Sequence, residues 1–190
     1  MPETVIAALA PELNSLQAVL RAASFAAEKH ASQRRKGAAA EPYVNHLLEV
    51  AYLVSTALTE PDANLISAAL LHDVIEDTGV TKAELIERFG ADVADLVAEV
   101  TDDKSLPKAE RKRLQIVNAP HKSVRAQVIK LADKISNLRA ILNSPPANWS
   151  FDRRKEYFLW AKQVVDGLSA PNPVLRAEFD QTYRRFEEQW

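Results

Sequence analysis

The sequence has 190 residues, of which 47% are hydrophobic and 26% are charged, and its net charge at pH 7 is −2. This length suits one domain with a well-buried core, and the nearly balanced charge speaks against a nucleic-acid polymer as a partner. The absence of cysteine excludes disulfides, thiolate metal sites and a cysteine nucleophile. No apolar run approaches the ~20 residues of a membrane span, and residues 1–20 lack the pattern of a signal peptide. We therefore expect a cytoplasmic protein without a membrane partner.

Hydrophobic residues recur with helical spacing along the chain, and no alternating strand pattern persists beyond a few residues. The expected fold class is therefore all-α, a single helical bundle. In chain order, the predicted helices cover about 13–31, a segment capped by Asn45, Pro61 to Gly79, 82–89, 91–101, Pro107 to the residue before Pro120, 124–142, 151–166 and 173–189. His30, near the end of the first helix, is expected to be a hydrogen-bonded core residue.

The predicted helix that ends at Gly79 carries a histidine and three acids in its last turns. On a helical wheel Asp73, Glu76 and Asp77 share an arc of roughly 140° with His72, on the side that holds apolar residues one and two turns earlier. At the C-terminal end of a helix the dipole disfavours acids by roughly 0.3–1 kcal/mol each. A positive group is therefore expected there, and a divalent metal ion is the simplest candidate.

Further candidate metal ligands lie on two other predicted helices. His46 enters the core at a helix start, and Asp133 lies in the middle of the most apolar helix, where a buried acid needs a partner. With the adjacent pair His72 and Asp73 they offer nitrogen and oxygen ligands, a set suited to Mn²⁺, Fe²⁺, Co²⁺ or Zn²⁺. Such an ion would activate a water and polarise a phosphoryl oxygen. The pattern predicts phosphoester hydrolysis, with the two later acids of the His72 helix handling the proton.

Basic residues cluster at three places although the overall charge is balanced. The clusters are Arg34–Lys36, Lys108 with residues 111–113, and Arg153–Lys155. Taken alone, a run of this kind is usually a solvated face. Three such runs in a chain with an inferred cation site favour a small polyanionic substrate.

Six blocks of the sequence form a pattern more specific than a His-Asp pair. They are Arg34–Lys36, Pro42–His46, Ala69–Thr78, Thr101–Lys108, Leu131–Arg139 and Glu156–Ala161. Together they resemble the HD phosphohydrolase superfamily, and more closely the small alarmone hydrolases of the metazoan SpoT homologue type, single-domain relatives of the hydrolase half of RelA/SpoT enzymes. The resemblance covers about residues 20–165 and implies one HD domain over 1–190, with the C-terminal helices 151–189 packed on it.

The resemblance also implies an activity and a set of site residues. The reaction would be hydrolysis of the 3′-pyrophosphate of ppGpp or pppGpp to GDP or GTP plus pyrophosphate, with one Mn²⁺ per chain or another divalent ion in its place. The implied metal ligands are His46, His72, Asp73 and Asp133, and the implied catalytic acids are Glu76 and Asp77. The implied substrate contacts are Arg35, Lys36, Asn137, Lys108, Arg153 and Tyr157. One departure from the family is Leu47, where proline is common; a proline there would lie early in the helix, so its loss should cost little.

Two other functions stay open at this point. One is an HD-domain phosphatase that acts on NADPH or another nucleotide, and the other is a nucleotide-binding regulator without chemistry. The regulator is disfavoured because a pure binder could dispense with Glu76 and Asp77, which this chain retains. The two enzymatic functions share the same residues, so only substrate competition can separate them.

Overall fold

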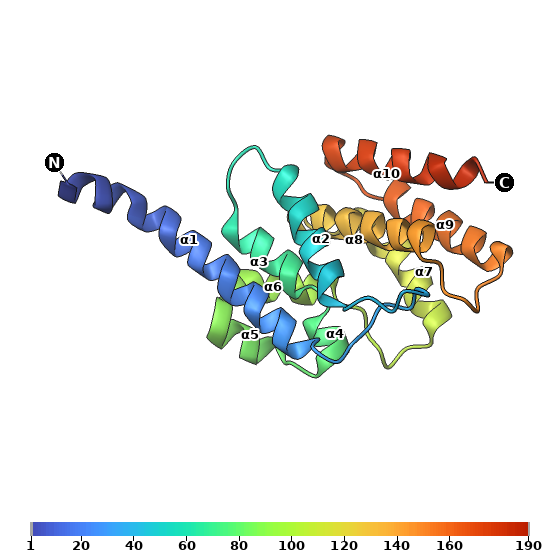
Figure 1. Ribbon diagram of the computed structural model, residues 1–190, viewed down its shortest axis with the longest axis horizontal. Coiled ribbons are helices and arrows are strands. Elements are labelled where there is room, and N and C mark those ends of the chain that lie inside the picture. The colour runs from blue at the N-terminus through green and yellow to red at the C-terminus, as the bar shows by residue number, and fades with distance from the viewer. Residues whose placement is uncertain (1, 190) are drawn as a thin grey trace.

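The computed structural model describes residues 2–189, with side chains from Asn14 onward, and this part of the chain is helical without strands. The elements are α1 (Pro2–Lys29), α2 (Val44–Thr56), α3 (Ala63–Leu71), α4 (Val74–Thr78), α5 (Lys82–Phe89), α6 (Ala91–Val100), α7 (Lys108–Asn118), the 3-10 turn η1 (Ala119–His121), α8 (Val124–Asn143), α9 (Phe151–Asp166) and α10 (Pro173–Glu187). The predicted all-α class is confirmed. The N-terminal part of α1 extends beyond the other helices (Figure 1).

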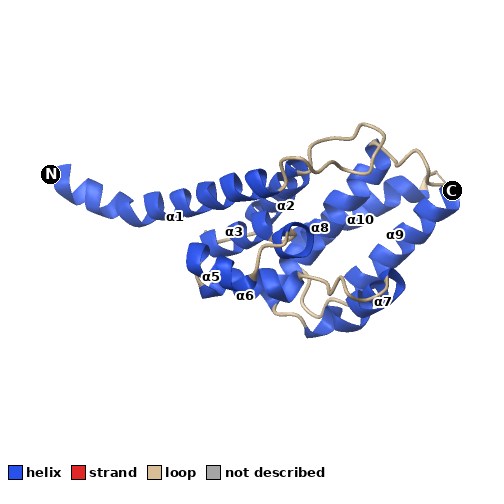
Figure 2. Ribbon diagram, turned by 90° about the horizontal axis from the view of Figure 1, so that it is seen from below, coloured by secondary structure: helices blue, strands red, loops and turns tan. Residues whose placement is uncertain are grey.

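Helix α8 lies at the centre of the packing. It contacts α2, α3, α6, α9 and α10, and Figure 2 shows it among these helices from a second direction. Leu131, Ile135 and Leu138 are fully buried on one side, and Ile129 is 1% exposed on the other. A helix that is apolar on two sides needs neighbours on both. Any polar side chain in the middle of α8 is therefore held inside the protein.

Two helices start differently from the prediction. Helix α3 begins at Ala63, and Pro61, predicted to start it, lies outside the helix. Asp62 is the N-cap, because its Oδ1 accepts a hydrogen bond from the Leu65 N–H at 2.9 Å. Asn45 does not cap α2, which begins at Val44 after Tyr43. The loop before it is closed by a bridge between residues 34 and 42 and by the Tyr43 N–H bonded to the Gln33 carbonyl at 3.1 Å, so the chain is already turned when it reaches Tyr43.

The predicted helix from Pro61 to Gly79 is interrupted. Helix α3 ends at Leu71 and α4 begins at Val74, so His72 and Asp73 form the junction between them. The His72 Nδ1 lies 2.8 Å from the Ala69 carbonyl oxygen, which in a continuous helix accepts a hydrogen bond from a backbone N–H. Gly79 ends α4 with a φ of 77°, as its predicted role as a stop requires. The four polar side chains of this segment therefore lie in the junction and on α4, not on one face of a single helix.

None of the helices within residues 2–189 combines the length and the apolar character that a membrane span needs.

Candidate metal centre

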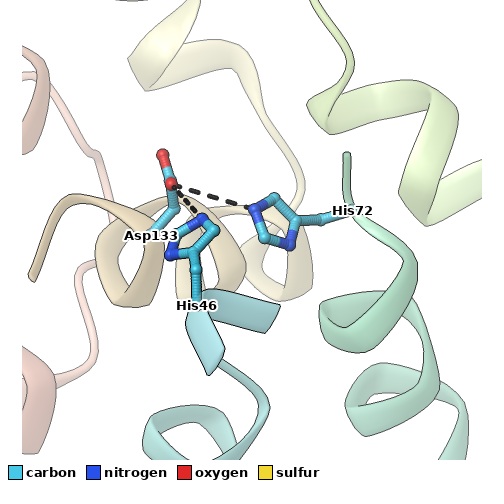
Figure 3. Close-up of side chains that lie close together, drawn as sticks. All are labelled: His46, His72 and Asp133. Carbon is cyan, nitrogen blue, oxygen red and sulfur yellow. Dashed lines mark ion pairs between the residues drawn. The ribbon is translucent and has the colours of Figure 1, made fainter. Parts of the chain in front are cut away.

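Three parts of the fold bring one ligand atom each to a common point. His46 comes from the start of α2, His72 from the α3–α4 junction and Asp133 from the middle of α8, and their ligand atoms lie within 4.8 Å of one another. The Asp133 Oδ1 is 3.4 Å from the His46 Nε2 and 3.8 Å from the His72 Nε2. Both imidazole rings point toward this carboxylate (Figure 3). All three side chains are buried.

Asp73 completes the cluster from the junction itself. Its Oδ2 lies 3.2 Å from the Nε2 of His72 and 3.6 Å from the Nε2 of His46. The same oxygen accepts a hydrogen bond of 2.6 Å from the Tyr43 hydroxyl, and burial together with Asp73 raises the pKa of Tyr43, which keeps that hydroxyl a donor. The four residues for which the sequence predicts ligation are thus brought together.

Hydrogen bonds to the Nδ1 atoms of the two histidines fix which ring nitrogen faces the cluster. Ser136 donates its hydroxyl to the Glu49 Oε2 at 2.6 Å, so its oxygen accepts from the Nδ1 of His46 at 2.8 Å. The His72 Nδ1 donates to the Ala69 carbonyl, which can only accept. With Nδ1 engaged in this way, the Nε2 of each ring is the atom that can bind a proton or a metal ion between the carboxylates, and each is buried without a hydrogen-bond partner among the described residues. Two such nitrogens facing two carboxylates fit a divalent metal ion.

The charges of the cluster point the same way. Burial by itself would lower the pKa of His72, but Asp73 and Asp133 raise it to about 10. Burial would likewise raise the pKa of Asp73, yet His72 and His46 hold it well below its usual range. The pKa of Asp133 is also lowered, against burial, chiefly by Lys134. The cluster therefore favours an added positive charge between its members.

Asp133 is fixed by its own helix. Lys134 donates to its Oδ2 at 2.9 Å, and the Asn137 side-chain amide donates to its Oδ1 at 2.6 Å. Lys134 is 3% exposed and lies over the Trp160 ring, 4.7 Å from the ring centroid. The Oδ2 of Asp133 is thus paired with an ammonium group, while its Oδ1, held by the Asn137 amide, faces the two histidines.

The two predicted catalytic acids differ in their surroundings. Glu76 accepts from the Asp102 N–H at 3.3 Å and lies 3.4 Å from a guanidinium nitrogen of Arg111. Burial raises its pKa, and the charges of Asp73 and Asp102 add to the effect. Its neighbour along α4, Asp77, is contacted by the Gln33 amide and by Lys104, and unlike Glu76 it lines the adjoining cavity.

A cavity of about 430 Å³ opens beside the cluster. Five of the six predicted substrate contacts line it: Arg35, Lys36, Lys108, Asn137 and Tyr157. The sixth, Arg153, does not line the cavity. Its guanidinium lies 4.6 Å from the ring centroid of Trp149, and Trp149 does line the cavity. The structure thus places a basic and aromatic wall next to the cluster.

The basic residues of this wall are close enough to repel one another. Burial lowers the pKa of Lys108, and the charges of Lys36, Arg153 and Arg111 lower it further. An anion among these groups would relieve the repulsion. The cavity therefore suits a ligand with several negative charges.

Several residues that hold the site were not singled out in the sequence. They are Gln33, Tyr43, Lys104, Lys134 and Ser136. All except Gln33 lie within the blocks of family resemblance, so those blocks could have indicated them. Gln33 directly precedes the basic run that begins at Arg34, and nothing in its spacing marks it.

Comparison with known proteins places these features in context. A family model for the HD domain matches residues 22–161. The chain is 50% identical over 165 residues to the guanosine-3′,5′-bis(diphosphate) 3′-pyrophosphohydrolase MESH1 of Xenopus tropicalis, across 87% of this chain and 92% of that protein. It is 48% identical over 167 residues to MESH1 of Homo sapiens, across 88% and 93% of the two chains. The solved structure of a metazoan ortholog of SpoT that hydrolyses ppGpp superposes with a TM-score of 0.85 at 47% identity, covering 88% of this chain and 94% of that one.

Proposed function

We propose that this chain, which belongs to the HD domain family, is a divalent-metal-dependent hydrolase that removes the 3′-pyrophosphate of ppGpp or pppGpp and leaves GDP or GTP. The observation that carries the proposal is the meeting of two buried, unpartnered Nε2 atoms and two carboxylates beside a cavity with basic walls. The names of the MESH1 relatives, at about half identity over most of both chains, supply the substrate.

The proposed metal ligands are His46, His72, Asp73 and Asp133. Their mixed nitrogen and oxygen atoms suit a first-row transition ion, and we assign Mn²⁺ to the site. When bound, such an ion lowers the pKa of a water and polarises a phosphoryl oxygen. The protein itself orients the two histidine ligands, because Ser136 and the Ala69 carbonyl hydrogen-bond the Nδ1 atoms of His46 and His72.

Glu76 and Asp77 are the proposed catalytic acids. Asp77 presents to the cavity a carboxylate held by Gln33 and Lys104, which suits it to orient a water and accept its proton. Burial raises the pKa of Glu76, which favours its protonated form and suits it to give a proton to the departing 3′ oxygen. Two carboxyls in unlike surroundings thereby divide the proton transfer.

The wall of the cavity holds the nucleotide in this proposal. Arg35 offers a guanidinium plane for the base, and Lys36 lies beside it for a phosphate. The Asn137 side-chain NH₂ donates one hydrogen bond to Asp133, which leaves its side-chain oxygen free to accept a hydrogen bond from a ribose hydroxyl. Lys108, Arg153 and Tyr157 contact the remaining phosphates.

A side-by-side assay tests the function. Purified protein is given ppGpp, pppGpp and NADPH, each with Mn²⁺, with Mg²⁺ and with a chelator, and released pyrophosphate and phosphate are measured separately. We expect pyrophosphate from ppGpp and pppGpp with Mn²⁺ and none with the chelator. Phosphate from NADPH without pyrophosphate from either alarmone would replace the proposal with a nucleotide phosphatase. Binding of ppGpp without any release would indicate a regulator.

A further inference from the structure

We propose that Gln33 is a positioning residue for Asp77, and that His30 fixes the Gln33 side chain for this role. The proposal rests on the proposed function, in which Asp77 handles the attacking water. It concerns two residues in the segment that directly follows α1, a helix that supplies none of the proposed ligands or acids.

A chain of two hydrogen bonds connects the core to the acid. The Gln33 Nε2 lies 2.8 Å from the Asp77 Oδ2, and the Gln33 Oε1 lies 2.6 Å from the His30 Nδ1. A carboxylate can only accept, so the amide must turn its NH₂ toward Asp77 and its oxygen toward His30. His30 must then donate from Nδ1. The imidazole thus sets which end of the amide faces the site.

The two residues are themselves held firmly. His30 is 2% exposed, and its N–H bonds the Ala26 carbonyl at 3.0 Å. The Gln33 N–H bonds the His30 carbonyl, also at 3.0 Å, so backbone and side chain tie the same pair together. A side chain anchored at both ends keeps little rotamer freedom, and the direction of its donor is preorganised.

The other restraints on the Asp77 side chain are weak. It lies near the end of α4, a helix of 5 residues that follows the interrupted junction and stops at Gly79. Its other oxygen is contacted by Lys104, whose side chain is 48% exposed and belongs to the loop between α6 and α7. A long exposed side chain restrains its partner weakly. Gln33 is therefore the fixed contact that sets the angle of the carboxylate toward the cavity.

His30 also supports the metal side of the site. Its ring stacks on Tyr43, with centroids 5.2 Å apart and planes 18° from parallel, and the Tyr43 hydroxyl donates to Asp73. A change at His30 can therefore act on Asp73 as well as on Asp77. Among the described residues, the Gln33 side chain bonds Asp77 and His30 and none of the proposed ligands, so it gives the cleaner test.

The first test replaces the donor with an apolar side chain of similar size. In Gln33→Leu we expect kcat for pyrophosphate release from ppGpp to fall roughly 10–100-fold, because a misdirected catalytic group costs that much. KM should stay within about twofold, and bound Mn²⁺ and the thermal midpoint should match the wild type. Gln17→Leu, at an exposed position of α1, is the matched control and should leave kcat unchanged.

The second test asks whether Gln33 acts through Asp77. Asp77→Asn lowers kcat in the proposed mechanism, and adding Gln33→Leu to it should cause no further loss, because coupled residues are not additive. His30→Phe keeps a ring against Tyr43 but removes the donor, and should lower kcat less than Gln33→Leu does. A wild-type kcat in Gln33→Leu, or a full additional loss in the Asp77→Asn background, would overturn the proposal.

These outcomes are separate from a failure of the proposed function. That failure would appear in the wild type, as absence of pyrophosphate release from ppGpp. If the wild type acted on NADPH instead, the ratio of kcat values for wild type and Gln33→Leu on NADPH would decide the role of Gln33 in the same way.

Discussion

The Oγ of Ser136 lies 2.8 Å from the Nδ1 of His46, although the two residues are 90 positions apart in the chain. The Ser136 hydroxyl donates a hydrogen bond to Glu49, so its oxygen accepts a hydrogen bond from the Nδ1–H of the imidazole. The opposite nitrogen of His46 is thereby kept as a lone pair facing Asp133 and Asp73. One hydroxyl thus fixes both the tautomer and the orientation of a proposed ligand.

Removing this hydroxyl should weaken metal binding. In Ser136→Ala we expect the affinity for Mn²⁺ to fall roughly 10–100-fold, because outer contacts of ligating histidines typically contribute that much. Equilibrium dialysis with Mn²⁺ measures it directly. Ser55→Ala, whose hydroxyl bonds only the Tyr52 carbonyl of its own helix, is the control. An unchanged affinity in Ser136→Ala would mean that His46 does not depend on this contact, or is not a ligand.

Much of the architecture was predictable because local signals and packing agree. The apolar stripes of α8 predict its burial, and Thr81 before α5 and Gly79 after α4 predict helix ends that the structure shows. The interruption at His72 was not predictable, because a helical wheel assumes a continuous helix. It depends on a side-chain bond to the Ala69 carbonyl that no periodicity reveals.

The candidate site was predictable only in part. His46, His72, Asp73 and Asp133 stand out because polar groups in apolar surroundings need partners. Their supports do not stand out, since Ser136 reaches a residue 90 positions away and Gln33 reaches one 44 positions away. A glutamine or serine has many acceptable positions in a chain, and only the folded structure shows which of them carries a function.

Glu76→Gln should separate stability from activity. The pKa of Glu76 is raised above 4.5 in the folded protein, so between the unfolded and folded values the folded state binds more protons. The free energy of unfolding then falls as the pH rises through that range. Glu76→Gln removes this loss, so in a chelator the variant should be more stable than the wild type at pH 7 and show a flatter dependence of its thermal midpoint on pH.

The same variant should be nearly inactive. Loss of a proton donor typically lowers kcat roughly 10²–10⁴-fold, and bound Mn²⁺ should stay at the wild-type level. Glu87→Gln, on an exposed position of α5, is the control for both measurements. A near-normal kcat would remove Glu76 from the mechanism, and an unchanged pH dependence of stability would refute the raised pKa.

Arg35→Ala should weaken nucleotide binding without affecting the metal. Its guanidinium lines the cavity and lies 5.8 Å from the ring centroid of Tyr43. Loss of a stacked cation worth about 1.4 kcal/mol corresponds to a KM for ppGpp raised roughly tenfold. Steady-state kinetics with measured metal content test this, with Arg184→Ala on α10 as the control. Equal KM values would leave the Arg34–Lys36 run as a solvated face.

Substrate binding should also depend on salt. Burial and the nearby charges of Lys36 and Arg153 lower the pKa of Lys108, so these three cations lie close together and their combined field attracts an anion. We expect KM for ppGpp to rise with added KCl, and to rise less steeply in Lys108→Gln than in the wild type. Parallel slopes for the two proteins would place Lys108 outside the binding field.

In the proposed mechanism, pyrophosphate release from ppGpp requires a divalent ion held by His46, His72, Asp73 and Asp133. The most direct measurement is bound Mn²⁺ and pyrophosphate release on the same preparation of Asp73→Ala, beside the wild type and Asp95→Ala, whose side chain is 62% exposed. We expect Asp73→Ala to lose both the metal and the turnover, while Asp95→Ala keeps both. Turnover retained in Asp73→Ala without bound metal would contradict it.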